Sequence, residues 1–194
     1  MTIETQLVTI AEFEAFIAKP ENAGRHFELI NGEIVEDIPT LMHAAIVMAI
    51  AFQLRLFING KTLGWVLPEA RYKIPGDDHN TLIPDLSFVS KARGTLTTTG
   101  AADFLPDLAI EVQSPGQSDQ DLIDKGHLYL KHGVRLVWLV YPKNQLVEVL
   151  LPDDRKLYSG QQVFTGEDVL PGFEMTARAM FDVDADSSRE GGSG

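Results

Sequence analysis

Two almost continuous apolar segments, Leu108–Val112 and Leu136–Val140, enclose a polar segment that begins at Ser118 and ends at Gly133. Apolar runs of this kind are typical of strands covered on both faces of a sheet. Ser118 is a suitable N-cap and Gly133 a suitable terminator, so the polar segment between them is predicted to be a helix. A strand–helix–strand unit of this length joins parallel strands through a crossover. The sequence therefore predicts an α/β (α+β) fold with a central sheet.

The N-terminal part predicts a short helix, a hairpin and a long helix. Thr9 and Glu12 have the spacing of a capping box, which opens the short helix. Asn31-Gly32 joins two alternating runs, and this dipeptide is the strongest short hairpin signal because a type I′ turn needs positive φ at both positions. The long helix is predicted over Leu41–Ile58. Apolar residues cover so much of its circumference that we expect it to be buried on most sides.

Further strands follow along the chain, with no internal repeat and no domain boundary. They are predicted at Trp65–Leu67, Ala70–Ile74, Leu82–Val89 and Leu146–Leu151. The segment from 95 to 102, rich in Thr, Gly and Ala, is predicted to be a flexible loop. We expect one domain over residues 1–181 and a disordered tail over residues 182–194, where Ser, Gly and Asp dominate.

Composition excludes several classes of protein. A chain of 194 residues without cysteine has no disulfides, no thiolate metal site and no cysteine nucleophile. The first residues carry no basic segment followed by an apolar run, and the most apolar stretch, Ala44–Phe52, is too short to span a bilayer. We therefore expect a cytoplasmic protein that does not bind a membrane. The formal net charge of −12 counts against nucleic acid unless basic groups cluster locally.

Two acidic residues occur inside apolar runs, where acids are costly. Asp85 lies in Ile83–Val89, and Glu111 lies in Leu108–Ser114. A buried carboxylate costs several kcal/mol unless a cation or a hydrogen-bond donor compensates it. Carboxylates from neighbouring strands form the oxygen-rich kind of site that suits Mg²⁺ or Mn²⁺. The pair therefore predicts a divalent metal held by Asp85 and Glu111.

Three further side chains are candidates for the same site. Gln113 lies two positions after Glu111, and alternation along a strand places both on one face, toward Asp85. Lys125 and Tyr129 lie at i and i+4 on the following helix and share a face. Lys125 can supply a positive charge near a scissile phosphate.

The residues in this order resemble those of a known group of nucleases. Pro84-Asp85 followed by Glu111-Val112-Gln113 is similar to the core motif of the PD-(D/E)xK nuclease superfamily. The wider series resembles the Uma-type restriction endonuclease family, and it spans roughly residues 27–149. This series comprises Phe27-Glu28-Leu29-Ile30-Asn31-Gly32-Glu33, His43, Pro84-Asp85, Ile110-Glu111-Val112-Gln113-Ser114-Pro115, Asp119, Lys125, Tyr129 and Trp138-Leu139-Val140.

The resemblance implies a restriction-endonuclease-like fold, a central mixed β-sheet flanked by helices. It also implies metal-dependent hydrolysis of DNA phosphodiester bonds, with Asp85 and Glu111 as metal ligands. The superfamily usually has a lysine two positions after the second acid, where this chain has Gln113. Related branches often carry the lysine on the following helix, which makes Lys125 the candidate. A homodimer is expected, because cutting both DNA strands needs two sites and the segment after Tyr141 offers edge strands for pairing.

Each candidate also has a structural interpretation. Asp85 could accept hydrogen bonds from backbone N–H groups at a strand edge, and Lys125 could pair with Asp121 on a solvated helix face. His43 could be a core histidine or a proton carrier near the acids. The auxiliary candidates are His43, Glu28 and Tyr129, and Glu69 is a candidate third metal ligand.

Two functions of different classes follow. The first is a metal-dependent endonuclease with Asp85, Glu111, Gln113 and Lys125 at its centre. The second is a catalytically inactive nuclease-fold module that serves binding or assembly. The acidic balance and the absence of lysine at position 113 favour the second.

Overall fold

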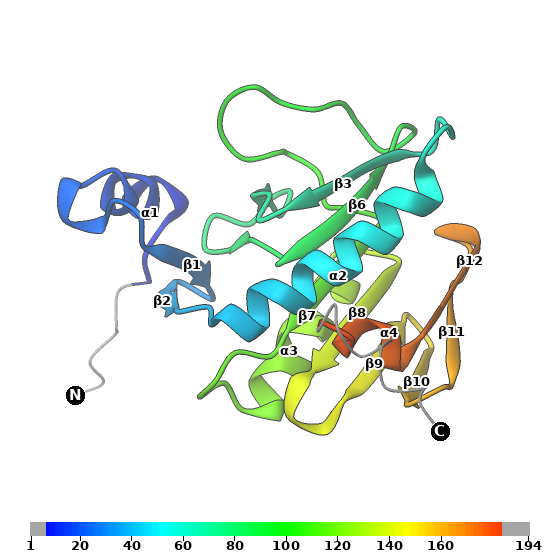
Figure 1. The fold of residues 1–194 in the computed structure, drawn as a ribbon. Helices are drawn as coiled ribbons and strands as arrows, with labels where there is room; N and C mark the ends of the chain where they lie inside the picture. Colours follow the sequence, from blue (N-terminus) through cyan, green and yellow to red (C-terminus); the bar gives the residue numbers. More distant parts are fainter. Residues whose placement is uncertain (1–6, 184–194) are drawn as a thin grey trace, which may run out of the picture.

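A computed structural model describes residues 7–183, which form a central sheet flanked by helices, a small N-terminal sheet and a C-terminal hairpin (Figure 1). The six-stranded central sheet has the strand order β10-β9-β8-β7-β6-β3. Its strands are β3 (Gly64–Pro68), β6 (Leu86–Ser90), β7 (Leu108–Val112), β8 (Leu136–Tyr141), β9 (Leu146–Leu151) and β10 (Asp154–Ser159). β7 and β8 pair in parallel, and the other neighbours pair antiparallel. The predicted mixed sheet flanked by helices is confirmed.

The helices cover the two faces of the central sheet. The helix α2 (Leu41–Ile58) crosses one face together with α4 (Ala177–Phe181), and α3 (Asp119–Lys131) covers the other. Alternation along the strands separates two cores. Ile110 and Trp138 pack on the α2 side, whereas Ala109 and Leu139 pack on the α3 side. The parallel β7–α3–β8 unit is therefore buried on both faces, as the apolar runs predicted.

A small N-terminal sheet projects to one side of the central one (Figure 1). Its strand order is β2-β1-β5-β4. It consists of β1 (His26–Ile30), β2 (Glu33–Asp37), β4 (Tyr72–Lys73) and β5 (Thr81–Leu82), with α1 (Ile10–Ile17) and a 3-10 turn at Pro20–Asn22 beside it. The predicted capping box at Thr9 and the hairpin turn at Asn31-Gly32 are both present, with positive φ at the two turn residues.

The strands and the helix that follow β9, beginning with β10, are not among those predicted from the sequence. After β10 the chain forms a hairpin of β11 (Val163–Gly166) and β12 (Leu170–Thr176), and then α4. Phe164 and Phe173 from this hairpin pack against Trp138, with ring centroids 4.9 and 5.7 Å away. The hairpin thus closes the α2 side of the core. Of the predicted tail, residues 184–194 lie outside the described residues.

The predicted strand over Leu82–Val89 is wrong as a single element. The chain leaves the N-terminal sheet after Leu82 and enters the central sheet at Leu86. Pro84 lies between them and has no N–H to donate to a ladder, so the segment around it cannot continue a strand in a sheet interior. Strand β4 is likewise shorter than the predicted Ala70–Ile74. The break places Asp85 at the junction of the two sheets.

The prediction that α2 is buried on most sides is also wrong. One stripe faces the core: His43, Ile46, Ile50, Leu54 and Ile58. The opposite side is exposed, because the helix lies on a single sheet face and only one stripe can contact it. The helix has 18 residues and a mean hydropathy of 1.9, so by length and composition alone it could cross a membrane. The most apolar stretch of the sequence, Ala44–Phe52, is only part of this helix and is too short to do so. The buried stripe of the helix instead belongs to the domain core.

The buried hydroxyl of Tyr72 yields a stability prediction. Tyr72 lies 2.7 Å from Ser87 Oγ, and Ser87 in turn donates to the Leu67 carbonyl. Burial raises the pKa of Tyr72 to about 12, with the Ser87 hydrogen bond opposing it. Because the folded state holds this proton more tightly, the contribution is complete below the unfolded pKa and is lost as pH rises from about 10 toward 12.

We therefore expect Tyr72→Phe to lower the free energy of unfolding by about 1 kcal/mol at neutral pH. The difference between wild type and variant should shrink as pH rises above about 10, since the phenylalanine has no proton to lose. Urea denaturation of both proteins between neutral and alkaline pH measures this. A difference that stays constant would contradict the assignment.

Candidate active site

A cavity of about 1410 Å³ lies where the N-terminal sheet meets the carboxyl end of β7 and the helix α3. Its lining includes Glu28, His43, Asp85, Glu111 and Lys125. These side chains come from β1, α2, the β5–β6 junction, β7 and α3. The sequence-predicted acids and the displaced lysine therefore line one cavity, although they are up to 97 positions apart in the chain.

Lys125 holds two carboxylates at the base of this cavity. Its Nζ donates to both oxygens of Glu28, at 2.9 and 2.8 Å, and to Glu111 Oε2 at 2.9 Å. The side chains of all three residues are at most 14% exposed. Lys125 does not pair with Asp121, whose carboxylate instead completes the cap of α3 at Ser118. The lysine therefore reaches the second acid of the motif from the following helix.

Tyr129 fixes the other oxygen of Glu111. Its hydroxyl donates to Glu111 Oε1 at 2.7 Å, and its ring is buried. Lys125 and Tyr129 lie one helical turn apart, so a single face of α3 presents both donors to one carboxylate. Gly126 lies beside Lys125 and faces the sheet, where an added Cβ would come within 2.8 Å of Leu150. The close approach of α3 to the sheet sets the reach of Lys125.

Asp85 is held beside this group by backbone and histidine contacts. Its Oδ2 accepts from the Val112 N–H at 2.6 Å, and His43 Nε2 lies 3.1 Å from the same oxygen. Because β6 and β7 are antiparallel, the start of β6 lies next to the end of β7. Asp85 therefore makes the backbone contact expected for an Asp at a strand edge, and it also lines the cavity.

The acids and the lysine perturb one another. Burial raises the pKa of Glu111, the Lys125 ammonium opposes this rise, and the charges of Asp85 and Glu28 add to it. Burial alone would lower the pKa of Lys125, but the three carboxylates raise it. Burial and the same carboxylates raise the pKa of Tyr129. Lys125 therefore remains charged at neutral pH, since its ammonium lies 2.9 Å from Glu111 and contacts a second carboxylate, Glu28.

Two predicted site residues lie apart from this group. Gln113 donates to Asp119 Oδ1 at 2.7 Å and to the Gln117 carbonyl at 3.1 Å, at the start of α3. Glu69 lies at the rim, with a side chain 57% exposed and 3.7 Å from His26. Gln113 therefore connects the end of β7 to the start of α3. Among the described hydrogen bonds and ion pairs, neither Gln113 nor Glu69 contacts Lys125 or its two carboxylate partners.

A further buried acid was not singled out from the sequence. Glu148 on β9 is 1% exposed, accepts from the Tyr141 hydroxyl at 2.9 Å and forms an ion pair with Arg155. It lies in the same cross-strand row as Glu111, with Leu139 between them. The signal was present, since Glu148 is an acid within an apolar strand, and its partner Arg155 lies on the next strand, β10.

The carboxylates around Lys125 are of the chemical type that binds a divalent cation. Within residues 7–183 no three His, Asp or Glu side chains converge as a ready-made metal group. Three carboxylates nevertheless surround one ammonium, which leaves excess negative charge in a buried place. Mg²⁺ is usually held by one or two carboxylates and keeps several waters. Asp85 and Glu111 can supply that pair of carboxylates.

The chain is similar to one protein family and to one solved structure, both described as putative nucleases. The family Uma2, described as "Putative restriction endonuclease", matches residues 10–179. A crystal structure of a putative nuclease belonging to DUF820 from Anabaena variabilis superposes with a TM-score of 0.75 at 23% identity, covering 91% of this chain and 98% of that one. No match was found among curated proteins. The structural likeness shows the fold, and the restriction-endonuclease-like class predicted from the sequence is confirmed.

Removing the ammonium should destabilise the domain. We expect Lys125→Met to lower the free energy of unfolding by about 3–5 kcal/mol at pH 8, because it removes the buried ammonium that both Glu28 and Glu111 contact. The loss should be smaller at pH 6, since burial raises the pKa of Glu111 and this carboxylate can then bind a proton. Guanidinium denaturation at both pH values measures this. Lys131→Met, an exposed change on the same helix, should alter stability by less than about 0.5 kcal/mol, and equal effects of the two variants would contradict the proposed buried pair.

Proposed function

Because this chain belongs to the Uma2 family of putative restriction endonucleases, we propose that it hydrolyses DNA phosphodiester bonds with the help of a divalent metal ion, Mg²⁺ or Mn²⁺. The observation that carries the proposal is the contact of Lys125 with Glu111 across two elements of the fold. Where the superfamily motif usually has a lysine, this chain has Gln113. Lys125 brings a positive charge to the second acid, Glu111, from the following helix. In this proposal Lys125 takes the part of the motif lysine.

Each side chain has a part in the proposed chemistry. Asp85 and Glu111 would hold the metal, which when bound stabilises negative charge on phosphate and lowers the pKa of a water molecule. Lys125 offers a positive charge beside the reacting phosphate, while Glu28 holds its ammonium in the cavity. Tyr129 orients Glu111 through its hydroxyl. These contacts fix the acids and the ammonium before substrate arrives, which reduces the reorganisation that the reaction needs.

Two other candidates act at a distance in this proposal. Gln113 holds the beginning of α3, and therefore the helix that carries Lys125, rather than binding phosphate itself. His43 lies against Asp85 and keeps its carboxylate at the cavity wall. Both are positioning residues.

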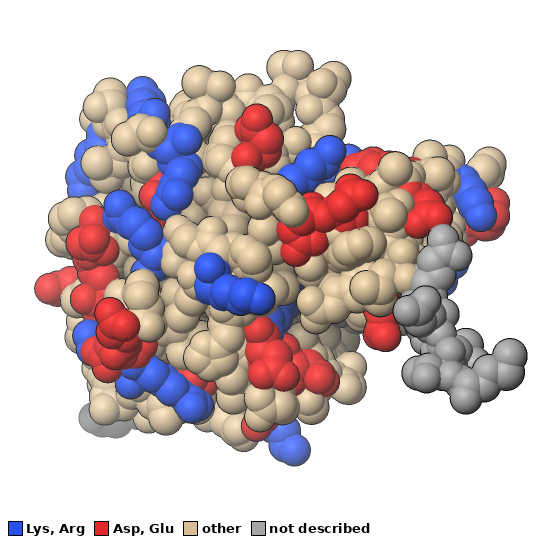
Figure 2. Space-filling model, turned by 180° about the vertical axis from the view of Figure 1, so that it is seen from behind, with Lys and Arg blue, Asp and Glu red and all other residues tan. Residues whose placement is uncertain are grey.

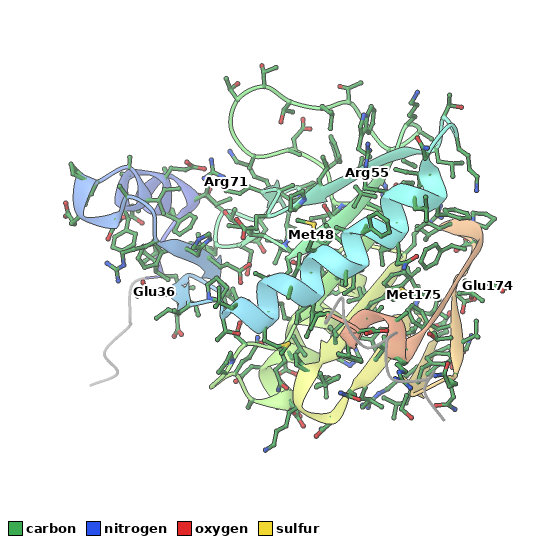
Figure 3. All side chains as sticks on the ribbon, viewed as in Figure 1. Glu36, Met48, Arg55, Arg71, Glu174 and Met175 are labelled. Atoms are coloured by element: carbon green, nitrogen blue, oxygen red, sulfur yellow. The ribbon has the colours of Figure 1, made fainter. Side chains whose placement is uncertain are left out.

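The acidic charge of the chain restricts how DNA could approach. Arg25 and Arg71 line the cavity, but Glu36 and Glu14 pair with them. Figure 3 shows Glu36 and Arg71 on the N-terminal part of the fold, near the hairpin and the first helix. On the face seen in Figure 2, Lys and Arg are interspersed with Asp and Glu. We propose that local cations at the cavity, together with the metal, carry the phosphate contacts, and that binding weakens steeply with salt.

The proposal also includes a homodimer and a cytoplasmic location. Two copies provide the two sites that cutting both strands needs. A binding or assembly module with the same fold is the second candidate. The net charge of −12 and the full pairing of Lys125 by two carboxylates favour that candidate.

Cleavage of supercoiled plasmid with Mg²⁺ or Mn²⁺ tests the proposal. We expect metal-dependent nicking, and Asp85→Asn or Lys125→Met should each slow it by at least about 100-fold, since both remove a charge that acts on the transition state. Glu174→Gln is the matched control. Glu174 is exposed on β12, away from the cavity (Figure 3). Equal nicking by wild type and Asp85→Asn would point to a contaminating nuclease, and no nicking by purified wild type would favour the binding module.

Metal binding can be measured without activity. An ion that binds the folded state alone raises the melting temperature with its concentration. We expect Mn²⁺ to stabilise the wild type, Asp85→Asn to abolish the shift, and Glu69→Gln to leave most of it because Glu69 is more than half exposed at the rim. If Glu69→Gln lost the shift and Asp85→Asn kept it, the metal would lie at the rim instead.

A further inference from the structure

The outward side of α2 carries an apolar stripe that nothing in the described chain covers. It consists of Leu41, Ala45, Met48, Phe52 and Leu56, called here the outer stripe. The four large side chains are 93%, 68%, 61% and 59% exposed in that order. Figure 3 shows Met48 near the middle of the helix and Arg55 nearer its C-terminal end. The residues recur every three or four positions, so they form one face of the helix along its whole length.

The charge of the chain indicates through which surface a second copy would bind. With a net charge of −12, two copies repel each other over most of their surfaces. The helix Leu41–Ile58 contains no Asp or Glu, and its single Lys or Arg is Arg55. Contact through α2 therefore avoids placing acid against acid.

The order of side chains along the stripe is self-complementary. If two copies of α2 lie antiparallel about a two-fold axis between positions 48 and 49, residues whose numbers add to 97 face each other. Leu41 then faces Leu56 of the second copy, and the two copies of Met48 meet beside the axis. The small Ala45 faces the large Phe52, which allows the helices to interdigitate. A two-fold contact of this kind uses the same patch on both copies.

The exposed area is close to what a dimer needs. Five large side chains of α2, the four of the outer stripe and Met42, are each more than half exposed. At about 150–250 Å² for a large side chain, they expose roughly 500–800 Å², which compares with about 800 Å² on each partner of a standard interface. Monomers rarely expose apolar patches of this size without a function. The opposite face of the helix carries His43 to Asp85, so contact through the outer stripe leaves the cavity open.

We propose that the outer stripe is the two-fold interface between two copies of this chain, with the α2 helices antiparallel. The proposal rests on the proposed function for its purpose, because cutting both strands needs two sites. The contact itself stands on the surface of α2 and needs neither metal nor DNA. It replaces the edge of β10 as the expected dimer contact.

Cysteine crosslinking tests the geometry, since the chain has no cysteine of its own. Met48→Cys should form a disulfide-linked dimer under mild oxidation, because the two copies of position 48 lie at the two-fold axis. Leu41→Cys should not, since its two copies would lie about 22 Å apart along the helices. Both positions are exposed, so neither change disturbs the core. Equal crosslinking at both positions, or at Leu41→Cys alone, would overturn the antiparallel contact.

Mass measured by light scattering after gel filtration, without metal or DNA, tests the surface. The wild type and Leu157→Glu should have the mass of two chains, and Phe52→Glu the mass of one. Leu157 is 51% exposed on the edge strand β10, so it matches Phe52 in chemistry and tests the other possible contact. Circular dichroism establishes that each variant is folded.

The other outcomes overturn the proposal. A wild type of single-chain mass does so, and if it also binds neutral lipid vesicles through Phe52, the stripe serves a membrane. Loss of the dimer in Leu157→Glu but not in Phe52→Glu would place the contact at β10. Asp85→Asn should remain a dimer although it is inactive, so failure of the nuclease proposal and failure of the interface can be told apart.

Discussion

The ammonium of Lys125 holds together the parts of this fold that meet at the cavity. Glu28 comes from the N-terminal hairpin, Glu111 from the central sheet and Lys125 from the helix that joins β7 to β8. Each carboxylate alone would be costly at its position, and so would the lysine. Their mutual compensation makes the position of the small N-terminal sheet depend on the same contact that shapes the site. Stability and chemistry are therefore coupled at one buried group.

The motif read along the chain and the motif assembled in space differ in one instructive way. At Gln113 the strand has already ended, and its side chain turns to Asp119 rather than to the acids. A lysine at that position would have to follow the strand direction to reach Glu111. From α3 the approach comes from the layer above the sheet, and the close packing at Gly126 makes it short. The helix thus supplies the charge that the strand cannot, with Tyr129 one turn further on to orient the same carboxylate.

Patterns local in sequence predicted the parts of the fold that are determined locally. The bounds of α2 and of β7 follow from caps and apolar runs, and the i, i+4 spacing placed Lys125 and Tyr129 on one face. The sequence could not predict the contacts between residues that are far apart in the chain. Whether Glu28 points at the site depends on how two sheets are set against each other, 97 positions from Lys125. The exposure of α2 was misjudged for the same reason, because its apolar residues are equally apolar on both sides and only tertiary packing decides which side is covered.

That ambiguity of α2 has a physical meaning beyond prediction. A helix with one face in the core and a second apolar face in water retains a hydrophobic driving force after the domain has folded. In a chain with a net charge of −12, such a surface free of acids is the place where association costs least. The buried face carries His43 to the wall of the cavity, so α2 contributes both to the site and to the surface opposite it. One helix can therefore relate two copies of the cavity across a two-fold axis without either cavity having to change.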